Sequence, residues 1–301
     1  MRITLMHNPK AGDGKHDKKE LIAALKETGH RVTYQSTKKK GYKKALTKRS
    51  DLVLAAGGDG TVGKVGRKLV DTGIALSVLP LGTANNLART LGVRGSVEKI
   101  ISGLKRGKKH AFDVGLVRGP WGEECFFESI GGGLFADYLD QEHSEDQKKL
   151  SKEQELTRHV SLLRRMLHDY PGQNWKIEID GRDVSGRYLL WEAMNIQSIG
   201  PGLYLASPAL IQDGYLDFVY AREEDRSLFI DYLDAWLAGR KRKRFPLPLS
   251  RFRRLKFDWN GSRLHCDGKL RPPKKAKVKE ATNKIEVTVK PSSLVILQPR
   301  V

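Results

Sequence analysis

The sequence predicts an N-terminal doubly wound α/β domain followed by an antiparallel β-sandwich or barrel domain. Residues 51–92 contain two short apolar runs, 52–56 and 74–80, and each run ends in a glycine-rich turn that leads into a helical pattern. Strand and helix patterns alternate up to about residue 105, which is typical of βαβ units in a parallel sheet. From about residue 175 the pattern becomes rich in strands. These three observations give the fold class, α/β followed by β.

The first domain is expected to cover residues 1–119. It should begin with a strand at 2–7 and a helix near 16–28 that Gly29 ends. A second strand at 31–35 and a lysine-rich helix near 41–49 should then lead into the central stretch.

The second domain is expected to cover residues 120–289. A polar segment, 137–170, has helical periodicity, and Asp180-Gly181 predicts the turn of a hairpin. A further helix is expected at 226–239, and late strands lie within 284–299.

The composition indicates a phosphate-bearing partner and a reducing compartment. Among 301 residues, Lys and Arg number 55 and Asp and Glu 35, a net charge of +20, which favours nucleic acid, an anionic membrane or a phosphorylated substrate. Cys125 and Cys266 form no disulfide framework. No run approaches the roughly 20 apolar residues of a spanning helix, and the N-terminus lacks the apolar core of a signal peptide. We therefore expect a cytoplasmic protein that meets any membrane from the water side.

Two glycine-rich turns follow the apolar runs of the central stretch. They are Gly57-Gly58-Asp59-Gly60-Thr61 and Gly82-Thr83-Ala84-Asn85-Asn86. Glycines at a strand exit let the backbone approach a ligand, and the next helix offers free N–H groups to an anion. Ligands of open α/β sheets bind outside the carboxyl ends of the strands. One such turn would be an ordinary connection, whereas the pair predicts a nucleotide phosphate site.

These turns resemble the catalytic domain of the diacylglycerol kinase and sphingosine kinase family, and the GGDG turn is shared more distantly with NAD kinases. Four further motifs stand in the family's order, so the resemblance spans nearly the whole chain. It implies that the last strand, about 290–301, returns to the first domain. The four motifs are Asn8-Pro9-Lys10-Ala11-Gly12, Phe127-Glu128-Ser129-Ile130-Gly131, Asp213-Gly214-Tyr215-Leu216-Asp217 and Asp267-Gly268.

The first turn fits part of a phosphoryl-transfer site, which needs a phosphate cradle, a divalent cation and a base near the acceptor hydroxyl. Asp59 fits a carboxylate linked to Mg²⁺, and its alternative role is to cap the helix that follows. The cradle residues are Gly57, Gly58, Gly60 and Thr61. The resemblance adds Asn8, Lys10, Gly12, Gly82, Thr83 and Asn85 to an ATP site.

The resemblance also assigns roles to three aspartates. Asp267 would be the general base toward a lipid hydroxyl, although an isolated Asp-Gly is usually a hairpin turn. Asp213, and less firmly Asp217, would hold a second, structural Mg²⁺ or Ca²⁺, with a simple turn as the alternative.

Two positions depart from the family's pattern. Asn86 stands where the family often has aspartate, so an oxygen ligand is kept but its charge is lost. Lys269 stands where the family often has glutamate. It places positive charge beside the proposed base and should weaken that base as a proton acceptor, or it could bind a phosphate.

Residues 240–256 contain nine basic residues and no acidic one, with Phe245, Leu247, Leu249 and Phe252 between them. Such a stretch suits an anionic bilayer, at about 1 kcal/mol per Lys or Arg. Nucleic acid would accept it too, but beside a lipid kinase-like core we favour transient contact with a membrane.

The expected function is therefore transfer of the γ-phosphate of ATP to a lipid alcohol, such as diacylglycerol, at a membrane surface. One alternative is an NAD kinase-like enzyme. Another is a homologue that binds nucleotide and lipid but is impaired in catalysis through Asn86 and Lys269. The sequence does not identify the acceptor lipid or the oligomeric state.

Overall fold

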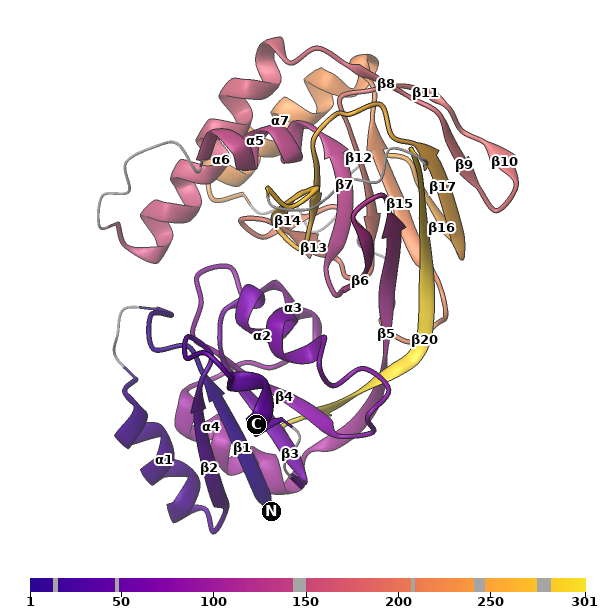
Figure 1. Ribbon diagram of the computed structural model, residues 1–301. Helices are drawn as coiled ribbons and strands as arrows, with labels where there is room; N and C mark the ends of the chain where they lie inside the picture. Colours follow the sequence, from indigo (N-terminus) through magenta and orange to yellow (C-terminus); the bar gives the residue numbers. More distant parts are fainter. Residues whose placement is uncertain (13–15, 47–48, 143–149, 207–208, 241–246, 275–282) are drawn as a thin grey trace. The chain divides into compact units, whose positions relative to one another are not determined.

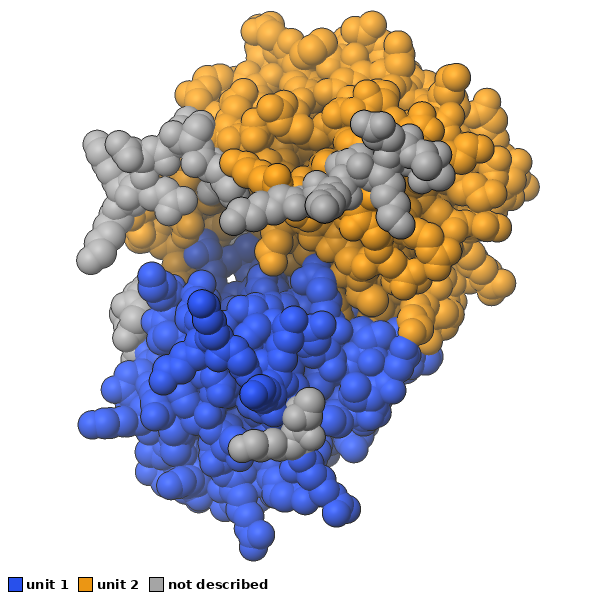
Figure 2. Space-filling view, viewed as in Figure 1, with its two compact units in different colours: residues 1–113, 292–301 blue, residues 114–291 orange. Residues whose placement is uncertain are grey.

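The computed structural model divides the chain into two compact units. Unit 1 contains residues 1–113 and 292–301, and unit 2 contains residues 114–291 (Figure 2), whereas the sequence predicts a boundary near residue 119. The structure describes residues 1–12, 16–46, 49–142, 150–206, 209–240, 247–274 and 283–301.

Unit 1 is built on a parallel sheet with the strand order β2-β1-β3-β4. The end of the last strand of the chain extends this sheet, because Ile296 pairs with Leu76 in a parallel register. Five of the six residues in the first strand and all six in the third are buried, as expected for strands covered on both faces. The strands are β1 Arg2–His7, β2 Arg31–Ser36, β3 Leu52–Gly57, β4 Ala75–Pro80 and β20 Lys284–Gln298.

Helices cover the sheet of unit 1 as two pairs, α1 with α4 and α2 with α3 (Figure 1). Asp17 and Glu20 form a capping box at the start of α1, which fixes where that helix begins. The helices are α1 Lys18–Glu27, α2 Asp59–Gly66, α3 Asn86–Thr90 and α4 Val97–Gly103, with 3₁₀ turns η1 Tyr42–Ala45 and η2 Leu104–Arg106.

The prediction of a lysine-rich helix near 41–49 is wrong, because the helical segment is much shorter. Only the 3₁₀ turn η1 forms, after Gly41 in a left-handed conformation with φ 79°; residues 47–48 lie outside the described part. Ala45 and Leu46 are the buried residues here, and two small contacts do not provide the apolar face that a surface helix needs.

Unit 2 is an antiparallel β-sandwich, as predicted. One sheet has the order β16-β15-β12-β7-β18-β19, and the other runs β10-β9-β17-β20, with β5 beside β20 and β6 beside β5. Between the sheets Trp191 contacts Trp175, Phe218 and Phe257, with ring centroids 4.9–6.4 Å apart.

The strands of the first sheet are β7 Ser129–Gly133, β12 Leu190–Met194, β15 Leu216–Ala221, β16 Leu249–Phe252, β18 Leu264–Cys266 and β19 Lys269–Arg271. Those of the second are β5 Lys108–Gly119, β6 Gly122–Phe126, β9 Ile177–Ile179, β10 Arg182–Asp183 and β17 Arg254–Asp258. Two short pairs complete unit 2, β8 Gln173–Trp175 with β11 Gly186–Tyr188 and β13 Ser198–Ile199 with β14 Leu203–Tyr204.

Helices pack on the other face of the first sheet. Leu190 and Met194 of β12 belong to one apolar cluster with helical residues such as Leu163 and Phe229. The segment 137–170, expected as one helical region, forms α5 and α6, and residues 143–149 between them lie outside the described part. The helices are α5 Leu134–Glu142, α6 Lys152–Asp169 and α7 Arg226–Leu237, with the 3₁₀ turn η3 Glu223–Asp225.

The predicted hairpin at Asp180-Gly181 is confirmed. Both residues have positive φ, 46° and 84°, which matches a tight two-residue turn between β9 and β10.

In the part of the chain that the structure describes, no helix is long and apolar enough to cross a membrane.

Candidate functional site

The two glycine-rich turns of unit 1 touch each other at the carboxyl ends of β3 and β4. Leu81 N donates to Gly57 O at 3.1 Å. A Cβ added to Gly82 would lie 2.4 Å from the Gly58 Cα, a distance that real Cβ atoms do not reach. The contact therefore leaves no room for a side chain at Gly82.

Asp59 joins the two turns. It is the first residue of α2, yet its Oδ1 accepts the Leu87 amide at 2.9 Å, in the first turn of α3. The pKa of Asp59 is raised because burial disfavours its charge, while the amides of Leu87 and Asn86 and the Arg89 guanidinium act in the opposite direction. Asp59 thus caps a helix, but the helix is α3 and not the one that follows it in sequence.

Asn85 closes the second turn on itself. Its Oδ1 accepts Gly82 N at 3.0 Å and its Nδ2 donates to Gly82 O at 2.7 Å. These bonds hold Asn85 at φ 51°, in the left-handed region that asparagine tolerates better than most residues. Asn85 therefore has a bracing role in the fold, while its predicted contact with nucleotide stays a prediction.

The first predicted phosphate loop, Asn8 to Gly12, starts beside the GGDGT turn. Asn8 N donates to Ala56 O at 2.9 Å, and Asn8 Oδ1 accepts Lys10 N at 3.2 Å. Gly12 has φ 70°, and residues 13–15, including the Gly14 and Lys15 of the basic turn, lie outside the described part. Since β1, β3 and β4 are neighbours in the sheet, the three predicted nucleotide loops lie at one edge of it.

Gly57 and Gly60 differ in how much space surrounds them. A Cβ on Gly57 would lie 2.5 Å from the Oγ1 of Thr61, which is itself buried, whereas one on Gly60 would meet nothing within 4 Å. The fold therefore needs Gly57 but does not need Gly60. Because packing does not require glycine at position 60, a substitution there tests whether a ligand approaches the backbone at this point.

In unit 2, Asp267 ties two predicted motifs together. Its carboxylate accepts Phe127 N at 3.0 Å and Glu128 N at 2.8 Å, and its own N–H donates to Ser129 O. Asp267 and Gly268 also form the turn between β18 and β19, with φ 46° and 65°. The hairpin alternative is thus correct, and the same residue also presents a half-buried carboxylate held by backbone amides.

The two departures from the family's pattern lie in different surroundings. Asn86 is buried at the start of α3, and its Oδ1 accepts the Arg89 guanidinium at 3.1 Å. Lys269 is exposed on β19, where it pairs across the hairpin with Cys266.

Asp213 and Asp217 form a pair of carboxylates beside β15. Asp213 accepts Tyr215 N at 3.0 Å and lies 3.4 Å from an Arg251 nitrogen. Asp217 is buried, and its Oδ1 has no hydrogen-bond partner among the described residues. Burial and the charge of Asp213 raise the pKa of Asp217 to about 7. An unsatisfied buried carboxylate oxygen beside a second carboxylate fits a hard cation, although the described residues contain no cluster of three or more acidic, His or Cys ligands.

The structure also contains a buried pair, formed by Glu192 and His265, that the sequence does not predict. His265 Nε2 lies 2.6 Å from Glu192 Oε1, and the pair bridges above Gly131 on the strand between them. A Cβ at Gly131 would lie 2.3 Å from Glu192 Oε1. Only the sheet register brings these residues together, and the one local signal was the glycine run of β7.

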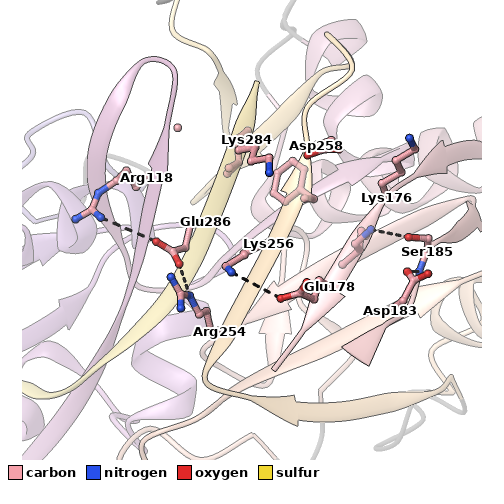
Figure 3. A pocket seen from close by; sticks show the side chains of 14 residues that line it. Arg118, Lys176, Glu178, Asp183, Ser185, Arg254, Lys256, Asp258, Lys284 and Glu286 are labelled. Atoms are coloured by element: carbon pink, nitrogen blue, oxygen red, sulfur yellow. Dashed lines mark hydrogen bonds and ion pairs between the residues drawn. The ribbon is translucent and has the colours of Figure 1, made fainter. Parts of the chain in front are cut away.

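Unit 2 also carries a groove of about 590 Å³ on the outer face of its second sheet (Figure 3). Its charges largely neutralise one another: Glu286 pairs with Arg118 and Arg254, and Glu178 lies 3.7 Å from Lys256. None of the predicted site residues lines this groove, so we do not place the chemistry there.

We predict that Gly60→Ala and Gly82→Ala separate ligand approach from folding. Alanine at Gly60 should stabilise α2 by up to about 1 kcal/mol but weaken ATP binding, since a phosphate that approaches the backbone meets the new methyl group. Alanine at Gly82 should destabilise the protein by about 1–3 kcal/mol through overpacking. Urea unfolding and titration calorimetry with ATP measure the two effects. Unchanged ATP affinity in Gly60→Ala would remove Gly60 from the phosphate cradle.

We predict that Asp217 makes the stability of the cation-free protein fall as pH rises. Its pKa is about 7 in the folded protein and 3.8 in ordinary surroundings, so the folded state binds the extra proton between these values and loses stability across that window. Asp217→Asn should therefore gain more free energy of unfolding over the wild type at pH 8 than at pH 5, with a chelator present throughout. An equal difference at both pH values would contradict this assignment.

Comparison with known protein families identifies two different domains in the chain. Residues 2–117 match the diacylglycerol kinase catalytic domain, and residues 140–298 match the YegS C-terminal NAD kinase beta sandwich-like domain. These matches bear out the resemblance seen in the motifs.

Relatives are similar over most of the chain. A diacylglycerol kinase of Bacillus subtilis is 26% identical over 248 residues, 79% of each protein. A probable YegS-like lipid kinase of Pectobacterium atrosepticum is 29% identical over the same share. The crystal structure of a putative diacylglycerol kinase from Bacillus anthracis has a TM-score of 0.74 and 20% identity, covering 99% of this chain and 96% of that one, and it supports the fold. The chain therefore belongs to the lipid kinase family of the diacylglycerol kinases and YegS-like proteins.

Proposed function

We propose that this protein transfers the γ-phosphate of ATP to the hydroxyl group of a lipid, with diacylglycerol as the first candidate. The observation that carries the proposal is the meeting of the Gly58 and Gly82 turns beside the Asn8 loop. Together these turns place backbone amides and glycines at the edge of a parallel sheet, where phosphates bind. The names of the relatives, diacylglycerol kinase and YegS-like lipid kinase, support the lipid acceptor.

In this proposal the residues of unit 1 bind and orient the nucleotide. Gly58, Gly60 and Thr61 hold the phosphates, with the Asn8 to Gly12 loop beside them. Mg²⁺–ATP supplies the phosphoryl group and a divalent charge that offsets its negative charge. The amides of α3 already hold the Asp59 carboxylate, so its fit to this metal is partial.

Asp267 would take the proton from the lipid hydroxyl. The amides of Phe127 and Glu128 hold its carboxylate in one orientation, as a positioned general base requires. We therefore propose Asp267 as the base, and Lys269 is exposed on the strand that follows it. An impaired homologue, the second candidate, would bind ATP and release no ADP with any lipid.

The protein would meet its substrate as a cytoplasmic enzyme in transient contact with an anionic membrane. In the described part of the basic stretch, Arg251 and Arg253 lie 5.3 Å and 4.6 Å from the Tyr215 ring centroid. Arg254 and Lys256 pair with Glu286 and Glu178. Residues 241–246, the most basic part, lie outside the described residues.

We predict that Asp267→Asn lowers lipid-dependent ADP release by at least about 100-fold, the usual contribution of a general base. The assay is ADP release from Mg²⁺–ATP in mixed micelles against a panel of lipid alcohols, with NAD included. Turnover of NAD alone would point to the NAD kinase-like alternative. Full turnover of a lipid by Asp267→Asn would remove Asp267 as the base.

Asp180→Asn is the matched control. Asp180 also begins an Asp-Gly turn, has φ 46°, and accepts the amides of Arg253 and Arg254 through its carboxylate. Each substitution should cost about 1–3 kcal/mol of stability, because an amide NH₂ then faces a backbone donor. Only Asp267→Asn should lose turnover, and equal losses would indicate a structural effect.

We further propose that Asp213 and Asp217 hold a structural Mg²⁺ or Ca²⁺. Either ion should then stabilise the wild type at pH 8 and raise its melting temperature. At a hundredfold excess of the ion over Kd, the free energy of unfolding should increase by about 2.7 kcal/mol. Asp213→Asn should lose most of this gain, while Asp180→Asn should keep it. A cation effect that survives in Asp213→Asn would place the ion elsewhere.

A further inference from the structure

The positive charge of the protein is concentrated in unit 1. Residues 1–113 and 292–301 contain 25 Lys and Arg against 9 Asp and Glu, a net charge of +16. Residues 114–291 contain 30 against 26, a net charge of +4, although they include the basic stretch 240–256. Acidic residues offset most of the basic residues in unit 2, so the excess that attracts anions belongs to the unit with the nucleotide loops.

Part of this charge gathers where β2 ends. Five lysines follow the strand within seven residues, all of them exposed: Lys38, Lys39, Lys40, Lys43 and Lys44. We call these five lysines, together with Lys64 of α2, the lysine corner.

Lys64 fixes the shape of the lysine corner. Its Nζ donates to Thr37 O at 2.6 Å and lies 4.1 Å from the centroid of the Tyr42 ring. Thr37 is in turn anchored to β1, because its N–H donates to His7 O at 2.8 Å. The loop that carries the exposed lysines is thereby held between α2 and the sheet.

The lysines of the corner repel one another. The pKa of Lys64 is lowered by burial first and then by the charges of Lys38 and Lys43. Within the described part of the chain, no carboxylate forms a salt bridge with Lys38, Lys39, Lys40, Lys43 or Lys64.

The groove of unit 2 shows the contrast. There each glutamate lies among the basic side chains it neutralises (Figure 3). Mutual repulsion in the lysine corner destabilises the folded protein, and a dense negative charge outside the protein would relieve it.

We propose that the lysine corner binds the surface of an anionic phospholipid bilayer. Its five loop lysines are exposed and lie within seven residues, and each such residue contributes about 1 kcal/mol near an anionic membrane. The half-buried Tyr42 ring among them is of the amphipathic kind that sits at headgroup level. This surface is distinct from the basic stretch of unit 2. The choice of a bilayer over nucleic acid rests on the proposed lipid substrate, but the binding itself requires neither ATP nor turnover.

The test is sedimentation of the full protein with phosphatidylcholine vesicles, with and without phosphatidylserine, in the absence of ATP. The variant Lys39→Gln/Lys40→Gln/Lys43→Gln leaves Lys64 and its contacts intact. Three lysines at about 1 kcal/mol each predict a roughly hundredfold loss of affinity for the phosphatidylserine vesicles. The loss should shrink at high salt, because salt screens exposed charges.

The matched control removes the same charge from a different part of unit 1, around η2 and the start of β5. Lys105 lies beside Gly29 and His30, which precede β2, and Lys105→Gln/Lys108→Gln/Lys109→Gln should keep most of the affinity. Equal losses in both variants would mean that net charge alone acts, and this would overturn the proposal.

Two further outcomes decide the partner. Equal binding of the wild type to both kinds of vesicle would overturn the proposal. So would binding to duplex DNA at a salt concentration where the phosphatidylserine vesicles are not bound, because the partner would then be nucleic acid. Failure of the kinase function would appear separately, as absent ADP release by a protein that still sediments with anionic vesicles.

Discussion

Unit 1 depends on one contact, the approach of Gly58 to Gly82, which the hydrogen bond from Leu87 N to Asp59 stabilises. Removing a side chain at both glycines lets two strand-to-helix turns meet, and the buried carboxylate then satisfies amides that helix α3 would otherwise leave without partners. Both effects act on the same few atoms. The edge of the sheet is therefore shaped before any ligand arrives, which reduces the ordering cost of binding.

Unit 2 uses the same device at Asp267. A carboxylate at a tight turn accepts backbone amides from a segment far away in sequence, here Phe127 and Glu128. Asp180 shows that this arrangement also occurs where no motif is present, since it accepts the amides of Arg253 and Arg254. Amide donors to an aspartate turn are thus a means of joining strands, and the proposed chemistry of Asp267 would depend on the other groups that it faces. For this reason the comparison of these two residues is more informative than either alone.

Local patterns were enough to predict β1, β3 and β4, α1 and α7, and the Asp180 turn, because each depends on nearby residues. The prediction of a lysine-rich helix after β2 was wrong because the few buried positions there do not form an apolar face. Only the short turn η1 forms. In the candidate site, the sequence predicts glycines and aspartates as candidates but not the contacts that they make. Asp59 meets Leu87 and Glu192 meets His265 through sheet order and register. Such contacts leave no periodic trace in a single sequence.

The two departures from the family's pattern differ in weight for the same reason. Lys269 is exposed on a hairpin, where water and salt screen its effect on Asp267. Asn86 is buried, its oxygen accepts the Arg89 guanidinium, and its amide N–H is among those that hold Asp59. An aspartate there would set a second carboxylate beside one that burial already disfavours as a charged group, unless a cation lay between them. Asparagine keeps the cap intact without that cation. In the proposed reaction, any weakening of catalysis should therefore arise at Asn86, through a looser hold on the proposed metal, before it arises at Lys269.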